Sequence, residues 1–255
     1  MSDSIRVDRG ERTATVTVDR PPLNVLDIPA LERLGRVADE LAALSDLAVV
    51  VVRGAGEKAF SAGVSVHDHT PDKVGHMLEV FHGALTRLRN LDAVTVAAVH
   101  GHCLGGGMEL ALACDLLVAT DDARFGQPEI ELGCYPPFAA ALYPSVLGPG
   151  RTLDLLLTGR TIGIDEAERM GFVTRRVVSA GLDEALAALT DQLLAKSTAV
   201  LRLTKKVVRA GRDLPFKDAL AETERAYLGD LCATADMQEG LTSFVEKRKP
   251  VWKHR

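Results

Sequence analysis

The spacing of apolar residues predicts most elements of this chain. Residues 5–9 and 13–18 alternate between apolar and polar side chains, which is typical of strands with one covered face. Continuous apolar runs predict strands covered on both faces, at residues 47–52, 94–99 and 116–119, and a last strand is expected at 173–178. Apolar residues that recur every third or fourth position predict helices, over residues 28–44, 73–90, 137–147, 150–157, 165–170, 182–196, 197–210, 216–230 and 235–247.

The order of these elements favours the α/β class. Strands and helices alternate along most of the chain, as in proteins that cover a sheet with helices. Beyond residue 182 every predicted element is a helix. We therefore place a boundary near residue 190, between a core at residues 1–190 and a helical region at residues 191–255.

A glycine-rich segment, residues 101–110, connects the strand at 94–99 to a short apolar helix. The consecutive glycines at 105–107 let another group approach the backbone, since no Cβ is in the way. The first N–H groups of the helix have no partner within it, so they can donate to an oxygen that becomes negative during a reaction. Glu109 follows in apolar surroundings, where a carboxylate is costly to bury unless it is paired or protonated.

Glu129 is a second carboxylate of interest, after a Gly-Gln-Pro turn and before a predicted apolar strand. Within one apolar pocket, repulsion and desolvation would leave a single proton on the pair of Glu109 and Glu129. Such a pair can take one proton from a water molecule and deliver another. The alternative is a helix glutamate satisfied by backbone donors and a second glutamate in solvent, and sequence distance does not decide between the two.

A second glycine turn, Phe-Ser-Ala-Gly at residues 60–63, also lies beside a predicted buried strand. N–H groups from the two separate turns, those of Ala62 and Gly106, would together form an oxyanion hole. Removing one such donor typically costs about 3 kcal/mol of transition-state stabilisation. Taken alone, the motif at 60–63 is weak and is more often an ordinary turn.

Composition limits the remaining classes of function. At 255 residues and 47% hydrophobic residues, the chain can bury one large core. Its net charge of −5 lacks the basic excess of nucleic-acid binding proteins. The absence of a run of about 18 apolar residues argues against a membrane-spanning helix. The cysteines lack the spacing of paired or metal-binding thiols, which predicts a reducing, cytoplasmic location.

Several histidines have a spacing that could bind a metal: His67 and His69, and His100 and His102. Metal sites need three or four ligands, and no third ligand stands out in the sequence. We therefore predict no metal site. His67 and His69 are expected in a loop after the first glycine turn, from which either could reach the active site.

Three segments, residues 60–63, 100–110 and 125–133, resemble the crotonase (enoyl-CoA hydratase/isomerase) superfamily in their order and spacing. The resemblance covers nearly the whole chain and includes residues 157–160 and 244–248. It implies an α/β core built as a spiral of ββα turns, and a helical C-terminal region that assembles a homotrimer or a dimer of trimers. It also implies an acyl-CoA thioester substrate, with coenzyme A as part of the substrate and no separate cofactor.

The resemblance also implies roles for individual residues. The thioester oxygen would bind between the N–H groups of Ala62 and Gly106, Glu109 would activate water, and Glu129 would donate a proton to carbon. Relatives that isomerise, hydrolyse or dehalogenate commonly lack one of the glutamates, so the presence of both favours hydration, a lyase reaction. Further residues are implied to bind substrate: Asn24, Leu26, Gly63, Val64, Ser65, Val66, Leu104, Gly105, Pro128, Leu132, Gly133, Tyr135, Phe138, and, in a neighbouring subunit's site, Phe244 and Lys247.

Two departures from hydratases of linear acyl chains concern the acyl pocket. Residues 63–67 lack the usual aspartate, and Cys-Tyr-Pro-Pro-Phe at 134–138 replaces a glycine-rich segment with rigid bulk. In these features the chain is similar to the cyclohexa-1,5-diene-1-carbonyl-CoA hydratases of aromatic compound degradation, which implies a cyclic dienoyl-CoA substrate. The alternatives are an ordinary 2-enoyl-CoA hydratase or isomerase, and a non-catalytic CoA-binding protein, for which two desolvated carboxylates would have no use.

Overall fold

The computed structural model describes residues 4–255, and its larger sheet has six strands. In sheet order they are β1 (Ile5–Gly10), β2 (Thr13–Val18), β3 (Val49–Gly54), β5 (Val94–Val99), β7 (Leu116–Thr120) and β10 (Arg175–Val177). The first two strands pair antiparallel, and the remaining neighbours pair in parallel. The predicted strands of this sheet are confirmed, with some ends shifted by one or two residues.

A smaller sheet contains four short strands, β4 (Ala59–Ser61), β6 (His102–Leu104), β8 (Arg124–Gly126) and β9 (Thr161–Gly163). Long strands of the first sheet lead into short strands of the second, β3 into β4, β5 into β6 and β7 into β8. The first two of these pairs are followed by helices, α2 (Val74–Arg89) and α3 (Gly106–Ala113). This succession confirms the expected α/β spiral of ββα turns.

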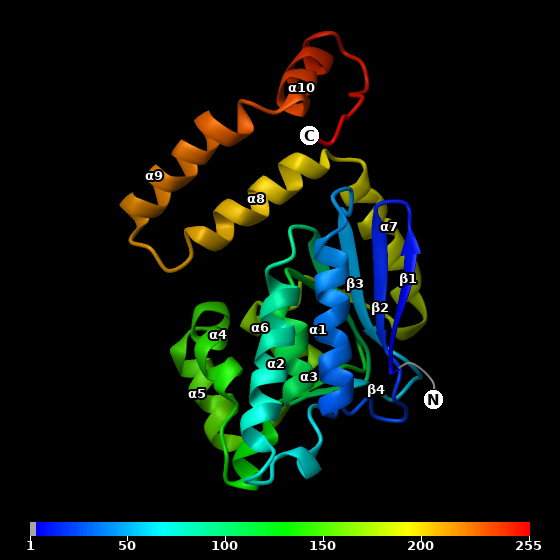
Figure 1. Cartoon of the computed structure of the whole chain (residues 1–255), viewed down its shortest axis with the longest axis vertical. Coiled ribbons are helices and arrows are strands. Elements are labelled where there is room, and N and C mark those ends of the chain that lie inside the picture. Colours follow the sequence, from blue (N-terminus) through cyan, green and yellow to red (C-terminus); the bar gives the residue numbers. More distant parts are fainter. Residues whose placement is uncertain (1–3) are drawn as a thin grey trace.

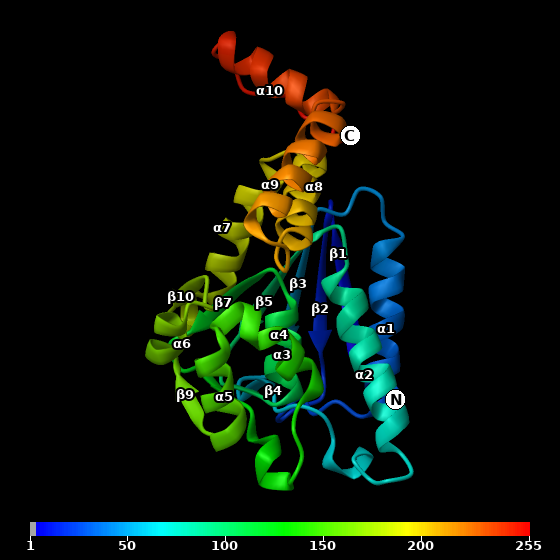
Figure 2. The ribbon, with the colours of Figure 1, turned by 90° about the vertical axis from the view of Figure 1, so that its left-hand side faces the viewer.

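The main core lies between the sheets and the helices that cover them. Helix α1 (Ile28–Ala42) packs along α2 on one side of the large sheet (Figures 1 and 2). Helix α3 is buried along its whole length, as expected for a helix that is apolar on every side. Helix α7 (Leu182–Leu194) covers the opposite face of the large sheet through three leucines. The remaining core helices are α4 (Pro137–Leu147), α5 (Pro149–Thr158) and α6 (Ile164–Met170).

The last three helices project from one end of the core (Figures 1 and 2). They are α8 (Thr198–Ala210), α9 (Phe216–Ala226) and α10 (Ala235–Val245). The regular helix predicted to residue 230 is wrong at its end, because α9 passes into a short π-helix, Tyr227–Leu231. The predicted domain boundary at residue 190 falls inside α7. The division into two parts, and the oligomeric role of the second, stay predictions.

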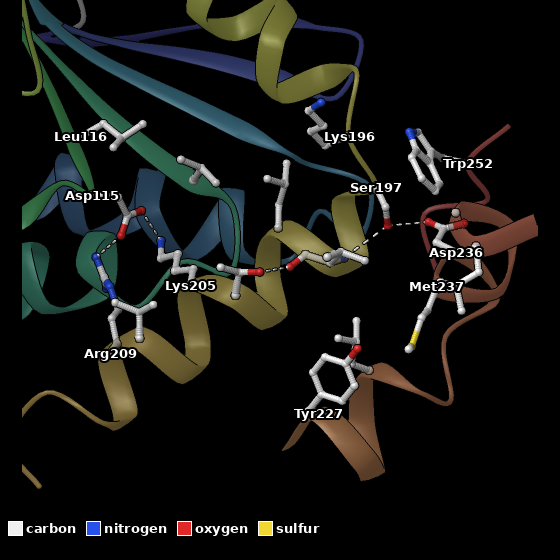
Figure 3. Close-up of a pocket in the computed structure, with 18 residues that line it drawn as sticks. Asp115, Leu116, Lys196, Ser197, Lys205, Arg209, Tyr227, Asp236, Met237 and Trp252 are labelled. Carbon is white, nitrogen blue, oxygen red and sulfur yellow. Dashed lines mark hydrogen bonds and ion pairs between the residues drawn. The ribbon is translucent and has the colours of Figure 1, made fainter. Parts of the chain in front are cut away.

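A cavity of about 640 Å³ lies between α8 and the segment from Tyr227 to Leu241 (Figure 3). Its lining is mostly apolar, and a half-buried carboxylate, Asp115, pairs with Lys205 and Arg209 at one end. The residues predicted for the active site line a different and smaller cavity. This larger cavity is therefore a feature of how the C-terminal helices meet the core.

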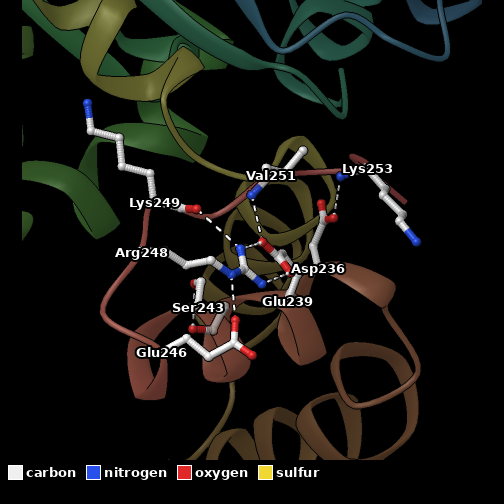
Figure 4. Close-up of polar contacts among 9 residues, drawn as sticks. Asp236, Glu239, Ser243, Glu246, Arg248, Lys249, Val251 and Lys253 are labelled. Carbon is white, nitrogen blue, oxygen red and sulfur yellow. Dashed lines mark hydrogen bonds and ion pairs between the residues drawn. The ribbon is translucent and has the colours of Figure 1, made fainter.

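The end of the chain folds back on α10 and the core. Arg248 pairs with Glu239 and with Glu246, at 2.5 and 2.6 Å (Figure 4). Further along, the indole Nε1 of Trp252 donates to the carbonyl oxygen of Ala195 at 2.8 Å, just after α7. The tail therefore ties α10 to the junction between α7 and α8.

Candidate active site

A cavity of about 430 Å³ opens where the two glycine turns meet α2 and the segment after β8. Many of the residues predicted for the site line it: Ala62, Gly63, Val64, Val66, Gly105, Gly106, Glu109, Pro128, Glu129, Leu132, Gly133 and Tyr135. Residues outside that set complete the lining: His69, Val74, Met77, Leu78, Phe81, His82, Cys134, Pro136 and Pro137. The structure thus brings both glutamates and both glycine turns to one cavity.

One face of α2 forms a wall of the cavity. The sequence predicted this helix but gave no indication that one of its faces would line a cavity. Val74, Met77 and Phe81 recur at helical spacing, and such a stripe is most often core. Met77 and Phe81 are indeed buried, yet all three also line the cavity. A periodic apolar face predicts burial but does not distinguish a packed core from a binding pocket.

Glu109 lies in α3, the helix that follows the second glycine turn, and is only 3% exposed. Its Oε1 accepts the N–H of Ala139 at 2.8 Å, near the start of α4. The pKa of Glu109 is raised to about 8, chiefly by burial and in part by the charge of Glu129, against the opposing effect of the Ala139 hydrogen bond. The carboxyl group is therefore largely protonated at neutral pH.

Glu129 lines the same cavity and lies in a 3-10 helix, Pro128–Leu132, whereas the sequence predicted an apolar strand directly after it. That prediction is wrong because Pro128 starts a helical turn and Gly133, at φ 72°, ends it in the left-handed conformation. Burial raises the pKa of Glu129 to about 7. Its Oε2 is buried and has no hydrogen-bond partner within residues 4–255, so this oxygen is available to a ligand or a water molecule.

The second glycine turn approaches Glu129 closely. Gly105 has φ 53°, and a Cβ at this position would lie 2.7 Å from Oε1 of Glu129. A side chain here would push the carboxylate out of place. Gly105 is therefore needed for two reasons: it allows the backbone conformation of the turn, and it leaves room for the carboxylate of Glu129.

The structure corrects the predicted pair of oxyanion donors. The N–H of Ala62 already donates to the carbonyl oxygen of Leu23 at 2.8 Å, and that of Gly63 donates to Ser61 Oγ at 3.1 Å. The N–H groups of Val64 and Gly106 have no hydrogen-bond acceptor in the described part of the chain. The unoccupied donors that the two turns bring together are therefore Val64 and Gly106, not Ala62 and Gly106.

These two amides lie close together because the turns meet backbone to backbone. A Cβ on Gly63 would lie 3.0 Å from the nitrogen of Gly106, and one on Gly106 would lie 3.4 Å from the nitrogen of Val64. The first turn is held by Leu26, whose N–H donates to the carbonyl oxygen of Gly63 and whose carbonyl oxygen accepts the N–H of Ser65. Both neighbours of Val64 are thus fixed, which leaves its own N–H free and in a defined position.

Some predicted substrate-binding residues support the site without lining the cavity. Leu26 is fully buried and holds the first turn. Asn24 is also fully buried, and its Nδ2 donates to the carbonyl oxygens of Ala55 and Ala59 at 2.9 and 2.7 Å. Its side chain therefore holds the chain at the start of β4. These hydrogen bonds indicate a structural role and not a direct contact with substrate.

The remaining predicted residues lie around or beyond the cavity. Ser65, Leu104 and Phe138 are next to lining residues but are not part of the lining. Phe244 is 84% exposed on α10, and Lys247 follows that helix, at the far end of the molecule from β4 and the start of α2 (Figure 1). One chain does not bring these two residues to the cavity, and their contact with a neighbouring subunit's coenzyme A stays a prediction.

Helix α4 contacts the segments that carry both glutamates. Besides the Ala139 N–H bound to Glu109, it supplies Tyr143 one turn later, whose hydroxyl accepts the Nε2 hydrogen of Gln127 at 2.7 Å. Gln127 lies two residues before Glu129, and both it and Tyr143 are fully buried. Burial and the charge of Glu109 raise the pKa of Tyr143, so its hydroxyl stays protonated. Sequence reasoning missed this pair, because nothing in the sequence places the two segments together.

The rim of the cavity is rigid and contains aromatic side chains. Pro136 and Pro137 follow Tyr135, which is 69% exposed at the cavity mouth. The rings of His82 and Phe138 stack beside it, with centroids 6.2 Å apart. Burial lowers the pKa of His82, so its ring is neutral at pH 7.

Two negative findings apply to residues 4–255. Within them, no three His, Cys, Asp or Glu side chains come together in a way that could hold a metal ion. The same residues include no helix of the length and apolarity that crossing a membrane requires.

Comparisons with known proteins agree with this geometry. The profile of the enoyl-CoA hydratase/isomerase family matches residues 8–255. A probable enoyl-CoA hydratase of Mycobacterium tuberculosis is 34% identical over 256 residues, which cover 99% of each chain. The carnitinyl-CoA dehydratase of Escherichia coli K12 is 34% identical over 263 residues, which cover all of both chains.

A solved structure extends the likeness to the whole fold. The crystal structure of an enoyl-CoA hydratase from Bacillus anthracis superposes with a TM-score of 0.93 at 30% identity, over 99% of this chain and 100% of the other. Hydratases and dehydratases of this kind are hydro-lyases. The chain therefore belongs to the enoyl-CoA hydratase/isomerase family, within the crotonase superfamily, and is an enzyme of the hydro-lyase class.

Proposed function

We propose that this enzyme adds water to a carbon–carbon double bond that is conjugated with the carbonyl group of an acyl-CoA thioester. The observation that carries the proposal is the content of one cavity: two carboxyl groups with raised pKa values, and two backbone N–H groups without acceptors. A protein that only bound coenzyme A would gain nothing from two desolvated carboxyl groups, which are costly to bury.

The amides of Val64 and Gly106 would bind the thioester oxygen. Water attack on the conjugated double bond moves an electron pair toward that oxygen, and the amides stabilise the negative charge of the resulting enolate. An ionised glutamate accepts one proton of the water as its oxygen bonds to carbon. The protonated glutamate then delivers a proton to the α-carbon, and the carbonyl group re-forms. The sum is one water added, with one proton still on the pair of glutamates.

The two glutamates are suited to share one proton near neutral pH. With pKa values of about 8 for Glu109 and about 7 for Glu129, the pair passes from two protons to none across this range. The resemblance implies that Glu109 activates water and Glu129 donates the proton. We assign the acid and base roles to the pair, since interacting groups titrate together.

For the acyl group we propose a cyclic dienoyl thioester, such as cyclohexa-1,5-diene-1-carbonyl-CoA. Support comes from the rigid Pro136–Pro137 wall and from the stacked rings of His82 and Phe138 beside it. A compact, planar ring fits flat and inflexible surroundings with little loss of conformational freedom. In a diene conjugated with the carbonyl group, the same amides and glutamates can act on the extended system.

A linear 2-enoyl-CoA is the second candidate. The relatives from Mycobacterium and Bacillus carry the name enoyl-CoA hydratase, and they match this chain over nearly its full length. The apolar face of α2 would receive an alkyl chain as readily as a ring. Under this alternative the catalytic groups and their roles are unchanged.

The test replaces each glutamate by its uncharged isostere. Glu109→Gln and Glu129→Gln should each lower kcat by about 100-fold or more, because each removes a proton-transfer group. Loss of the conjugated thioester absorbance is followed with crotonyl-CoA and with cyclohexa-1,5-diene-1-carbonyl-CoA. Glu131→Gln is the matched control, since this exposed side chain lies in the same 3-10 helix but outside the cavity lining. Near-wild-type turnover by either glutamine variant would remove that residue from the mechanism.

A further inference from the structure

His69 lies in the lining of the catalytic cavity, and the proposed hydration gives it no role. It follows a short 3-10 helix, Val66–Asp68, in the loop that continues from the first glycine turn. Nearby lining residues are apolar, among them Val74, Met77 and Leu78. A partly buried imidazole among apolar residues is a candidate for recognising a polar group on the ligand.

The hydrogen bond of the ring determines which nitrogen can act. Nδ1 of His69 lies 2.9 Å from the carbonyl oxygen of Ser65. A carbonyl oxygen can only accept, so Nδ1 carries the proton. In the neutral ring Nε2 then has the lone pair and can only accept a hydrogen bond.

Nε2 is open to a ligand. It forms no hydrogen bond within residues 4–255. It is also not fully buried, because it is absent from the buried side-chain atoms that lack a partner. The imidazole therefore presents an acceptor on the side that is accessible from the cavity or from solvent. An apolar acyl group would leave this acceptor unused.

The loop is fixed relative to the oxyanion donors. Ser65, which holds the ring through its carbonyl oxygen, donates its own N–H to Leu26 at 2.8 Å and directly follows Val64. Asp68 is 9% exposed, accepts the N–H of Ile28 at 3.2 Å, and so ties the loop to the start of α1. The position of His69 is thus set by the same contacts that position the Val64 amide, which favours a role in binding over that of a mobile surface histidine.

We propose that His69 is a specificity-determining residue whose Nε2 accepts a hydrogen bond from a hydroxyl group on the acyl part of the ligand. The inference rests on the proposed function, and it adds cyclic acyl-CoA thioesters that carry a hydroxyl group to the ligands that the site would bind. A site built to pair a hydroxyl group discriminates against the analogue that lacks it, because its own polar group then loses a partner.

The test is binding of four thioesters that the enzyme cannot hydrate: benzoyl-CoA and its 2-, 3- and 4-hydroxy derivatives, titrated calorimetrically. The wild-type protein should bind at least one hydroxybenzoyl-CoA about 5- to 10-fold more tightly than benzoyl-CoA, the range of one added hydrogen bond. His69→Phe should abolish that preference, and His69→Gln, whose amide oxygen can accept, should restore part of it.

His67→Phe is the matched control, since His67 lies in the same loop but is exposed and outside the cavity lining. It should keep the preference. Equal binding of all four thioesters by the wild-type protein, or an unchanged preference in His69→Phe, overturns the inference and leaves the proposed hydration intact. No binding of any thioester, together with no turnover of crotonyl-CoA or the cyclic diene, would instead refute the proposed function itself.

Discussion

Glu109 shows how the surroundings of one residue raise the pKa of an ordinary carboxyl group. It belongs to a helix that is buried on all sides, and its one hydrogen bond from Ala139 is too little to replace hydration. The sequence predicted this burial correctly from the apolar residues around it. The sequence could not show which amides are free, because the N–H of Ala62 donates to the carbonyl group of Leu23, 39 positions earlier along the chain.

The raised pKa of Glu109 predicts a specific dependence of stability on pH. Its pKa is about 8 in the folded protein and near 4.5 when unfolded, so the folded state holds more protons between these values. Stability of the wild-type protein therefore falls as pH rises through that window. Glu109→Gln, which cannot ionise, should gain on the order of 4 kcal/mol relative to wild type between pH 5 and pH 9. Urea unfolding at both pH values measures the gain, and a constant difference would contradict it.

At the scale of elements, α4 connects the two segments that carry Glu109 and Glu129. Ala139 and Tyr143 are four residues apart and so lie on the same face of the helix, one bound to Glu109 and the other to Gln127. The sequence predicted this helix within its observed bounds, 137–147, but predicted a strand where the 3-10 helix carries Glu129. The segment forms a helical turn because the flanking proline and glycine decide its backbone.

Removing the Tyr143 hydroxyl should affect turnover more than binding. In Tyr143→Phe the ring still fills its site, but Gln127 loses its partner and the segment of Glu129 is less firmly held. We expect kcat to fall by about 10-fold, with KM changed less than about twofold and the pH–rate profile shifted. Steady-state kinetics from pH 6 to 9 provide the measurement. Tyr135→Phe at the cavity mouth is the control, and an equal loss in both variants would argue against a positioning role.

At the scale of the whole molecule, the C-terminal tail, residues 248–255, links α10 to the core through hydrogen bonds. Asp236, at 1% exposure, accepts the N–H of Lys253 at 2.6 Å (Figure 4). It accepts the N–H of His254 at 2.8 Å. It also accepts the hydroxyl of Ser197 at 2.5 Å, ahead of α8 (Figure 3). A single carboxylate thus joins the tail, α10 and the start of α8.

Loss of this carboxylate should release the tail, and the protein carries its own probe. Trp252 is the only tryptophan of the chain and lies within the tail. Asp236→Ala should shift its fluorescence emission to longer wavelength and increase quenching by acrylamide, because the indole loses its fixed contact with Ala195. Glu246→Ala, which removes an exposed ion pair of Arg248, should leave both readings close to wild type. Unchanged fluorescence in Asp236→Ala would show that the tail is held by other contacts.

Local pattern was enough to predict the α/β class, nearly all helices, the strands of the larger sheet and the two glycine turns, because hydrophobic period and glycine content are properties of neighbouring residues. It did not predict the four short strands of the smaller sheet, which have too few residues to show a period. Tertiary structure alone decided which amides remain free, which apolar face becomes a cavity wall, that Tyr143 pairs with Gln127 behind the site, and that His69 lines the cavity while His67 does not. Each of these depends on hydrogen bonds or contacts between segments far apart in the chain, and hydrogen-bond donors are used or left free only once such segments have met.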